Sequence, residues 1–255
     1  MSFLVHRFYR CSGHKGFFQA PHPSACLPQS QPWNIKTSVR WNHGIAGNAT
    51  PRRKRIVVAV TGATGAPLAV SLLQHLKALD VETHLIMSKW GSATLKYELA
   101  APDDTPRYLE SLATKIYSPY DVSSSLSSGS FKTDGMIVVP CSMKTLAAIR
   151  VGYDNELISR AASVTLKERR RLVLVARETP LSSIHLENML EITRAGAIVF
   201  PPVMAFYTRP QSIEDMVQQS VRRMIDALDL ELGDHDARWE GFDWAKKAVE
   251  KEMHV

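Results

Sequence analysis

Short apolar runs alternate with longer amphipathic stretches from residue 55 onward. Runs of about five residues that are apolar almost throughout are typical of strands covered on both faces of a parallel sheet. The pattern predicts such strands at Ile56–Thr61, Thr83–Met87, Met136–Pro140, Leu172–Ala176 and Ala197–Pro201. Apolar residues at helical spacing predict helices at residues 66–79, 91–99, 142–150, 155–169, 183–195 and 212–230, with Ser212 as the N-cap of the last.

This alternation predicts one α/β domain with a doubly wound parallel sheet. In such sheets the carboxyl ends of the strands meet at one edge, where ligands bind. The loops at that edge are "TGATGAP", "MSKWGS", "PCSMKT", "RETPLSS" and "PPVMAFYTRP", and all but the first combine a hydroxyl with Lys or Arg. We therefore expect a site for a phosphorylated ligand there. The Ser-rich stretch at residues 121–131 is either a flexible part of that function or a plain surface loop.

Charge is distributed unevenly along the chain. The formal net charge of +6 would by itself point to a nucleic-acid partner. Residues 1–55, however, hold nine of the 31 Lys and Arg and no acidic residue, so the remaining 22 basic residues face 25 acidic ones, a net charge of −3. The body of the protein therefore gives no reason to expect a nucleic-acid partner.

Residues 1–50 are predicted to be a mitochondrial transit peptide. They contain Arg, His and Ser, lack acidic residues and lack the continuous apolar segment of a secretory signal. A disordered basic tail and, less favoured, a nucleic-acid-binding arm remain alternatives. We expect a single domain at residues 55–232 and a C-terminal tail or helix at residues 233–255. No apolar stretch is long enough to predict a membrane span.

The turn after the first predicted strand resembles a dinucleotide-binding loop but departs from it. The G-x-G-x-x-G fingerprint needs glycine at positions 60, 62 and 65, and position 60 is Val. An NAD enzyme also places Asp or Glu at the end of the second strand, where this chain has Ser88 followed by Lys89. These residues favour a mononucleotide such as FMN over NAD.

Three cations are candidates for holding an anion. Arg160 and Lys167 are seven residues apart, so they project from one face of a predicted helix. Arg223 flanks the apolar stripe of the last helix, whereas Arg222 points away from it. The plain alternative for each is a solvated surface side chain. Cys141, at a strand end with no His nearby in sequence, is expected to be a small packing residue rather than a nucleophile.

Several segments together resemble the flavin prenyltransferase family of the UbiX type, once called phenylacrylic acid decarboxylases. They are "VTGATGAPLAVSLLQHL", "SSGSF", "VVPCSMKTLAAI", "LKERR", "RETP", "AFYTRPQS" and "ARWEG", and the match runs from about residue 55 to 242. The resemblance implies a flavodoxin-like Rossmann three-layer sandwich, assembled as a homododecamer with FMN where subunits meet. It implies transfer of dimethylallyl from its phosphate or diphosphate to N5 and C6 of reduced FMN, to supply a UbiD-type decarboxylase. With the predicted transit peptide, we expect this reaction in the mitochondrial matrix.

The resemblance also implies roles for individual residues. FMN contacts are implied for Gly62, Ala63, Thr64, Ser88, Ser142, Met143, Lys144, Thr145 and Arg177. Contacts to the prenyl phosphate or its tail are implied for Arg160, Lys167, Tyr207, Arg223 and Trp239. Catalytic roles are implied for Thr64, Glu98, Lys167 and Glu178. The family usually has Ser where Thr64 stands. No metal is expected, because "PDDTP" lacks the second Asp pair of Mg²⁺-dependent prenyltransferases.

Two alternatives remain open. An FMN-dependent cysteine-type decarboxylase would carry a "PASANT"-like loop and a catalytic His, whereas this chain has "PCSMKT" and its His75, His84 and His185 are expected on element surfaces. A flavin-binding regulatory subunit without catalysis would have no need of Glu98, Lys167 and Glu178 together.

Overall fold

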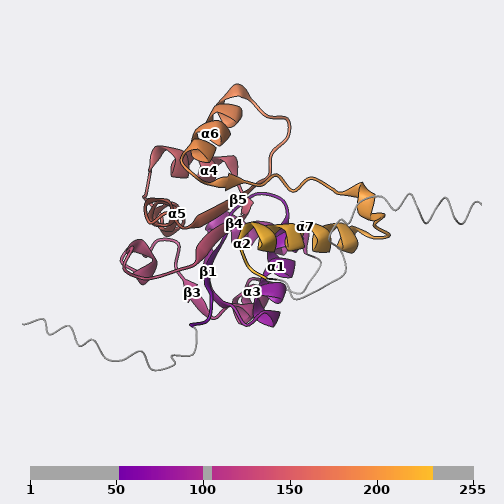
Figure 1. Ribbon diagram of the computed structural model, residues 1–255, viewed down its shortest axis with the longest axis horizontal. Helices are drawn as coiled ribbons and strands as arrows, with labels where there is room; N and C mark the ends of the chain where they lie inside the picture. Colours follow the sequence, from indigo (N-terminus) through magenta and orange to yellow (C-terminus); the bar gives the residue numbers. More distant parts are fainter. Residues whose placement is uncertain (1–51, 100–104, 232–255) are drawn as a thin grey trace, which may run out of the picture. The chain divides into compact units, whose positions relative to one another are not determined.

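The structure, a computed structural model, describes residues 52–99 and 105–231 (Figure 1). The predicted leader and C-terminal segment, and with them Trp239, lie outside the described residues. The strands are β1 (Arg55–Val60), β2 (Glu82–Met87), β3 (Lys115–Tyr117), β4 (Gly135–Cys141), β5 (Arg171–Ala176) and β6 (Ile198–Val199). The helices are α1 (Ala66–Ala78), α2 (Lys89–Glu98), α3 (Thr105–Leu112), α4 (Met143–Val151), α5 (Leu157–Lys167), α6 (Ser183–Arg194) and α7 (Ile213–Ala227), with 3-10 turns η1 (Ser125–Ser127) and η2 (Phe206–Thr208).

The strands form one parallel sheet in the order β3-β2-β1-β4-β5-β6. The predicted doubly wound α/β fold is therefore confirmed. When the short edge strand β3 is set aside, the other strands follow the 2-1-3-4-5 order of flavodoxin-like sheets. Ser212 caps α7 as predicted, since its side chain accepts a hydrogen bond from the Asp215 N–H at 3.1 Å.

The hydrophobic pattern did not predict β3 or α3. In β3 the side chain of Tyr117 is buried while Lys115 and Ile116 are exposed, so the strand leaves no apolar run in the sequence. In α3 Leu109 is buried among mostly polar neighbours. Both elements lie toward one edge of the sheet, where little surface is covered.

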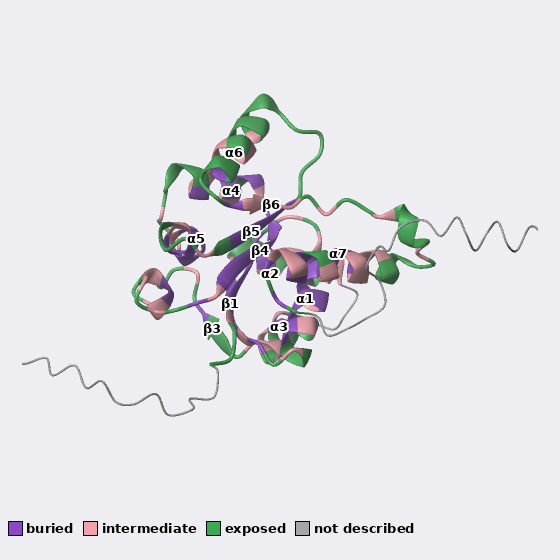
Figure 2. Cartoon of the chain, in the orientation of Figure 1, coloured by how far each residue is buried: buried purple, intermediate pink, exposed green. Residues whose placement is uncertain are grey.

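Helices cover both faces of the sheet (Figure 1), and the central strands are buried between them (Figure 2). Alternate side chains of β1 belong to two separate groups of core residues. Ile56 and Val58 pack with buried residues of α1 and α7. Val57 and Ala59 pack with buried residues of α4 and α5. Helices α5 and α7 therefore lie on opposite faces of the sheet.

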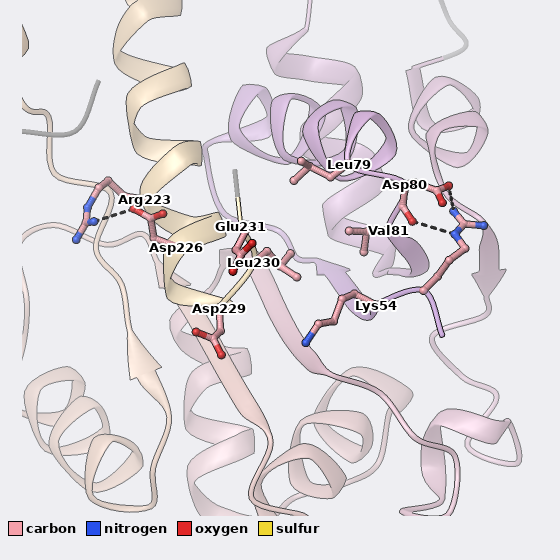
Figure 3. Close-up of a pocket in the computed structure, with 10 residues that line it drawn as sticks. Lys54, Leu79, Asp80, Val81, Arg223, Asp226, Asp229, Leu230 and Glu231 are labelled. Atoms are coloured by element: carbon pink, nitrogen blue, oxygen red, sulfur yellow. Dashed lines mark hydrogen bonds and ion pairs between the residues drawn. The ribbon is translucent and has the colours of Figure 1, made fainter. Parts of the chain in front are cut away.

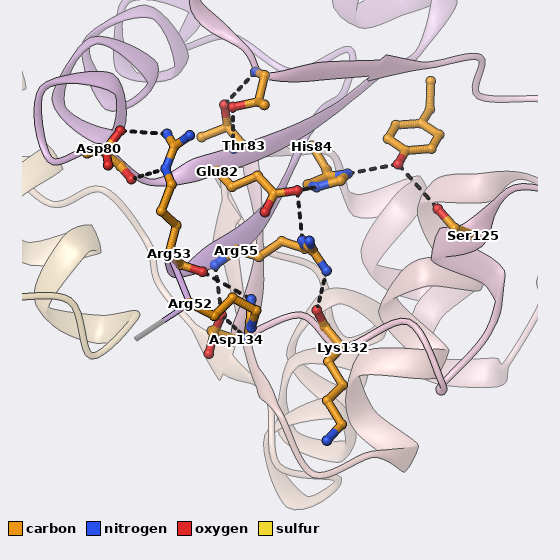
Figure 4. Close-up of polar contacts among 12 residues, drawn as sticks. Arg52, Arg53, Arg55, Asp80, Glu82, Thr83, His84, Ser125, Lys132 and Asp134 are labelled. Atoms are coloured by element: carbon orange, nitrogen blue, oxygen red, sulfur yellow. Dashed lines mark hydrogen bonds and ion pairs between the residues drawn. The ribbon is translucent and has the colours of Figure 1, made fainter. Parts of the chain in front are cut away.

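A buried polar network lies at the amino end of the central strands (Figure 4). His84 is 2% exposed, so the expectation that it lies on a surface was wrong. Its Nε2 lies 2.9 Å from Glu82 Oε1 and its Nδ1 lies 2.8 Å from the Tyr117 hydroxyl, and these partners allow an imidazole to be buried. Arg55 Nε also lies 2.9 Å from Glu82 Oε1. Burial lowers the pKa of His84, although Glu82 acts in the opposite direction.

We expect the protein to lose stability as the pH falls through 6.5, the ordinary pKa of a histidine. The unfolded chain then binds a proton at His84 that the folded protein excludes, so the free energy of unfolding decreases toward acid. Thermal unfolding of His84→Gln between about pH 7.5 and 5.5 should show a weaker pH dependence than the wild type. His75→Gln, at a half-buried position of α1, is the matched control. Equal slopes for the two variants would contradict this assignment.

Candidate functional site

The turn after β1 and the loop after β4 are joined at the carboxyl edge of the sheet by the hydroxyl of Thr61. Its Oγ1 donates to the carbonyl of Pro140 at 2.7 Å and accepts from the Ser142 N–H at 2.8 Å. Thr61 is 2% exposed. Sequence reasoning did not single out Thr61, although a hydroxyl directly after a buried strand was the available signal. Thr61 fixes the relative position of two loops predicted to bind FMN.

Serine side chains cap the helices that begin at this edge. Ser88 accepts from the Gly91 N–H at 2.9 Å at the start of α2, and Ser142 accepts from the Thr145 N–H at 3.4 Å at the start of α4. A Cβ on Gly62 would lie 2.4 Å from the Cβ of Trp90, so the turn after β1 packs closely on α2. Hydroxyls and the first N–H groups of these helices form a donor set suited to an anion.

The start of α1 is already occupied by a carboxylate of the chain itself. Glu98 Oε2 accepts from the backbone N–H groups of Gly65 and Ala66, at 2.9 and 2.8 Å. The Thr64 side chain lies beside this carboxylate and favours its charged form. Burial alone would raise the pKa of Glu98, but these hydrogen bonds and the charge of Arg177 lower it overall. Glu98 is therefore ionised at neutral pH.

A cavity of about 310 Å³ opens beside this carboxylate. It is lined by Thr64, Gly65, Pro67, Leu68, Glu98, Arg177, Pro202, Met204, Met216, Val217 and Ser220. Polar groups come from the loops after β1 and β5 and from the end of α2, and most of the apolar wall comes from α1, α7 and the segment after β6. A hydrogen-bonding edge against an apolar wall fits a flavin ring with a short hydrocarbon chain beside it.

The cations predicted to hold a phosphate are not brought together within one chain. Arg160 and Lys167 lie on α5, which packs on the opposite face of the sheet from α7. Tyr207, in η2, lies 3.4 Å from Gln219 Nε2 through its hydroxyl, and Gln219 is one helical turn from Arg223. The predicted set is therefore divided into two pairs. Arg160 and Lys167 lie on α5, whereas Tyr207 and Arg223 lie on or beside α7.

The remaining predicted residues occupy separate surroundings. Glu178 is exposed beside Arg177 and accepts from the Thr179 N–H at 3.2 Å. Met143 is buried, whereas the exposed Lys144 lies 3.9 Å from a Glu156 oxygen.

Cys141 is fully buried, and burial raises the pKa of its thiol to about 12, which is the environment of a packing residue rather than a nucleophile. Within residues 52–99 and 105–231, no three His, Cys, Asp or Glu side chains are arranged to hold a metal ion. The helices of the same ranges include none that is long and apolar enough to cross a membrane.

A larger cavity of about 860 Å³ lies at the other end of α7 (Figure 3). Its lining includes Lys54, Asp80, Arg223, Asp226 and Asp229. Arg223 is the member of the predicted donor set that lines it. The lining of this larger cavity is far more charged than that of the cavity beside Glu98, and it includes none of the residues predicted to bind FMN.

Comparison with known proteins agrees with the predicted fold and family. Residues 46–225 match the Flavoprotein family. The flavin prenyltransferase PAD1, mitochondrial, of Saccharomyces cerevisiae is 61% identical over 196 residues, which cover 77% of this chain and 79% of the yeast protein. The flavin prenyltransferase UbiX of Escherichia coli is 46% identical over 190 residues, which cover 74% of this chain and 99% of UbiX.

Solved structures give the same result. AnUbiX (PadA1), crystallised with FMN and dimethylallyl pyrophosphate, is 60% identical with a TM-score of 0.72, over 75% of this chain and 100% of that one. A dodecameric FMN-dependent UbiX-like decarboxylase from Escherichia coli is 51% identical, with a TM-score of 0.70. The match covers 73% of this chain and 100% of that one. A PPC decarboxylase shares the fold alone, since it is only 16% identical with a TM-score of 0.50. That match covers 69% of this chain and 100% of the other. The chain therefore belongs to the Flavoprotein family and, within it, to the flavin prenyltransferases of the UbiX type.

Proposed function

We propose that the protein joins the dimethylallyl group of dimethylallyl phosphate or diphosphate to N5 and C6 of reduced FMN. The prenylated FMN then passes to a UbiD-type decarboxylase. The observation that carries the proposal is the ionised Glu98 carboxylate, held by the Gly65 and Ala66 N–H groups next to Thr64 at the wall of the 310 Å³ cavity. The flavin prenyltransferase relatives and the FMN and dimethylallyl pyrophosphate bound in AnUbiX support it. No metal is part of the proposed site.

The FMN phosphate is assigned to the starts of α2 and α4. Glu98 already occupies the N–H groups at the start of α1, so an anion finds free N–H groups at the other two helices. Ser88, Ser142 to Thr145, and Arg177 supply donors around them, while Gly62 and Ala63 let the backbone approach the flavin. Bound reduced FMN supplies the N5 and C6 atoms that accept the prenyl group.

Thr64 is assigned to the proton at N5. An ionised carboxylate only accepts hydrogen bonds, so the Thr64 hydroxyl donates to Glu98 and its oxygen stays free to accept from an N–H on the flavin edge. The proton released from N5 can pass through Thr64 to Glu98. At C6 the released phosphate, with a second pKa of about 6, is a stronger base than Glu98, whose pKa is lowered.

The donor phosphate is assigned to Arg160, Lys167, Tyr207 and Arg223. We assign to Glu178, beside Arg177, the return of a proton to the leaving phosphate. Met204, Met216 and Val217 of the cavity wall exclude water from the hydrocarbon chain, and we assign Trp239 to the same tail. Such a site stabilises the departing charge through fixed cations.

The donor site is assigned to a meeting point of subunits. Lys167 and Arg223 lie on opposite faces of the sheet, so one chain cannot direct both at a single phosphate. A second copy that brings its α5 beside α7 of the first completes the set. We propose a homododecamer, the assembly stated for the Escherichia coli UbiX-like decarboxylase.

The mitochondrial matrix is the proposed location. The name of the yeast relative places that protein in mitochondria, in agreement with the acid-free, basic composition of residues 1–50.

Purified protein supplied with reduced FMN and dimethylallyl phosphate or diphosphate should yield a flavin heavier by one five-carbon prenyl unit. Thr64→Val keeps the shape but removes the hydroxyl, so we expect FMN binding with adduct formation slowed about 10²-fold or more. Thr64→Ser is the matched control and should retain activity. Mass spectrometry of the released flavin makes the measurement. The absence of an adduct with either donor, or CO₂ release from a cysteine-containing substrate instead, would refute the proposal.

Lys167→Ala and Arg223→Ala should each abolish use of the prenyl donor while FMN still binds. Equal amounts of the two variants can be unfolded, mixed and reassembled. A shared site is then intact when its α5 comes from the Arg223→Ala chain and its α7 from the Lys167→Ala chain, which random mixing gives in about a quarter of the sites. Adduct formation should therefore reappear in the mixture. Each variant taken alone through the same cycle is the control, and a mixture as inactive as its components would show that the two side chains do not meet across subunits.

Protein isolated from mitochondria should lack residues 1–50 and resist protease in mitoplasts, because a matrix protein is cleaved on import and enclosed by the inner membrane. N-terminal sequencing and protease protection make the measurement. An intermembrane-space marker, which mitoplasts lose, is the control. A chain that keeps its first residues would contradict the proposed leader.

A further inference from the structure

Each cation of the proposed donor set is paired with a carboxylate of its own chain. Arg160 Nη1 lies 3.3 Å from Asp154 Oδ2, Lys167 Nζ lies 2.5 Å from Glu168 Oε1, and Arg223 Nη1 lies 2.9 Å from Asp226 Oδ2. We call Asp154, Glu168 and Asp226 the paired acids. They cancel the formal charge of the cations, so the proposed site is not strongly positive before its ligand arrives.

The paired acids are less exposed than an ordinary surface ion pair of the same chain. Their side chains are 22%, 34% and 24% exposed in the order given, compared with 42% for Glu191, which pairs with Arg194 on α6. Partly buried charges are screened less by solvent and salt. The paired acids therefore act on a charged ligand more strongly than Glu191 does.

Glu168 is held in place from several sides. A Cβ on Gly129 would lie 2.0 Å from Glu168 Oε1, so a larger residue there would displace the carboxylate from its present position. Arg170 Nη2 donates to the Gly129 carbonyl at 2.7 Å and lies 3.8 Å from Glu168 Oε2. The contact with Lys167 lowers the pKa of Glu168, so it is charged at neutral pH. The "SSGSF" segment thus fixes a negative charge next to Lys167.

Asp154 is fixed in a similar way, because the Ser163 hydroxyl donates to its Oδ1 at 2.7 Å. Arg160 in turn donates to the Ser127 carbonyl at 3.1 Å through its other nitrogen. The η1 segment and α5 therefore position both an acid and its cation on the same face of the sheet.

We propose that the paired acids, and Glu168 above all, determine which prenyl donor the protein prefers by penalising the more highly charged one. This inference rests on the proposed function. A monophosphate ester carries about two negative charges at neutral pH and a diphosphate about one more. Each fixed carboxylate near the phosphate opposes that additional charge, so the diphosphate loses more binding than the monophosphate. Glu168 is a positioning and specificity residue, since it acts through Lys167 and through its charge.

Glu168→Gln removes one negative charge and keeps the size of the side chain. We expect its KM for dimethylallyl diphosphate to fall about threefold to tenfold more than its KM for the monophosphate, as one unit charge acts across several ångströms in a high dielectric. Adduct formation at varied donor concentration, with reduced FMN saturating, gives both values. The difference should shrink in high salt.

Two matched variants separate charge from structure. Glu168→Asp keeps the charge and should keep the wild-type ratio of the two KM values, and Glu191→Gln removes an acid from α6 and should also keep it. If Glu168→Gln does not fold, Asp154→Asn and Asp226→Asn test the same effect. Wild-type activity with an unchanged ratio in the folded variants would overturn the inference alone. No adduct from the wild type with either donor would overturn the proposed function.

Discussion

The carboxylate of Glu98 on the start of α1 organises the carboxyl edge of the sheet. It is the last residue of α2, yet it accepts hydrogen bonds from Gly65 and Ala66 after β1. Gly65 has a φ of 123°, which favours glycine and turns these N–H groups toward the carboxylate. One interaction thus joins two βα units and fixes the Thr64 hydroxyl. Its ionised state follows from the same contacts, because the backbone dipoles favour the anion.

The sheet determines which helices can contribute to one site. Successive residues of β1 face opposite helical layers, and α5 and α7 belong to different layers. The cavity beside Glu98 is built from one chain, whereas the proposed phosphate-binding cations are not. On the proposed assembly, donor binding therefore depends on how copies of the chain meet.

The sequence predicted most of the fold because parallel strands buried on both faces leave unmistakable apolar runs. It failed at β3, where Tyr117 alone is buried, and at His84, whose burial depends on Glu82 and Tyr117 from other positions of the network. The contact of Glu98 with α1 could not be predicted, because it joins segments distant in sequence, and the role of Thr61 was missed although its hydroxyl directly follows a buried strand. Helical spacing predicted the donor cations, whereas their pairing with Asp154, Glu168 and Asp226 is a feature of the folded chain that the sequence analysis did not consider.

The division of the proposed donor site between faces of the sheet also bears on the life of a newly imported chain. Such a chain carries all of the side chains proposed for the allylic phosphate, but on opposite faces of its sheet. On the proposed assembly it gains the ability to consume the donor only when it joins its copies. Oligomerisation then controls activity, since a chain that has not met its copies cannot transfer the prenyl group.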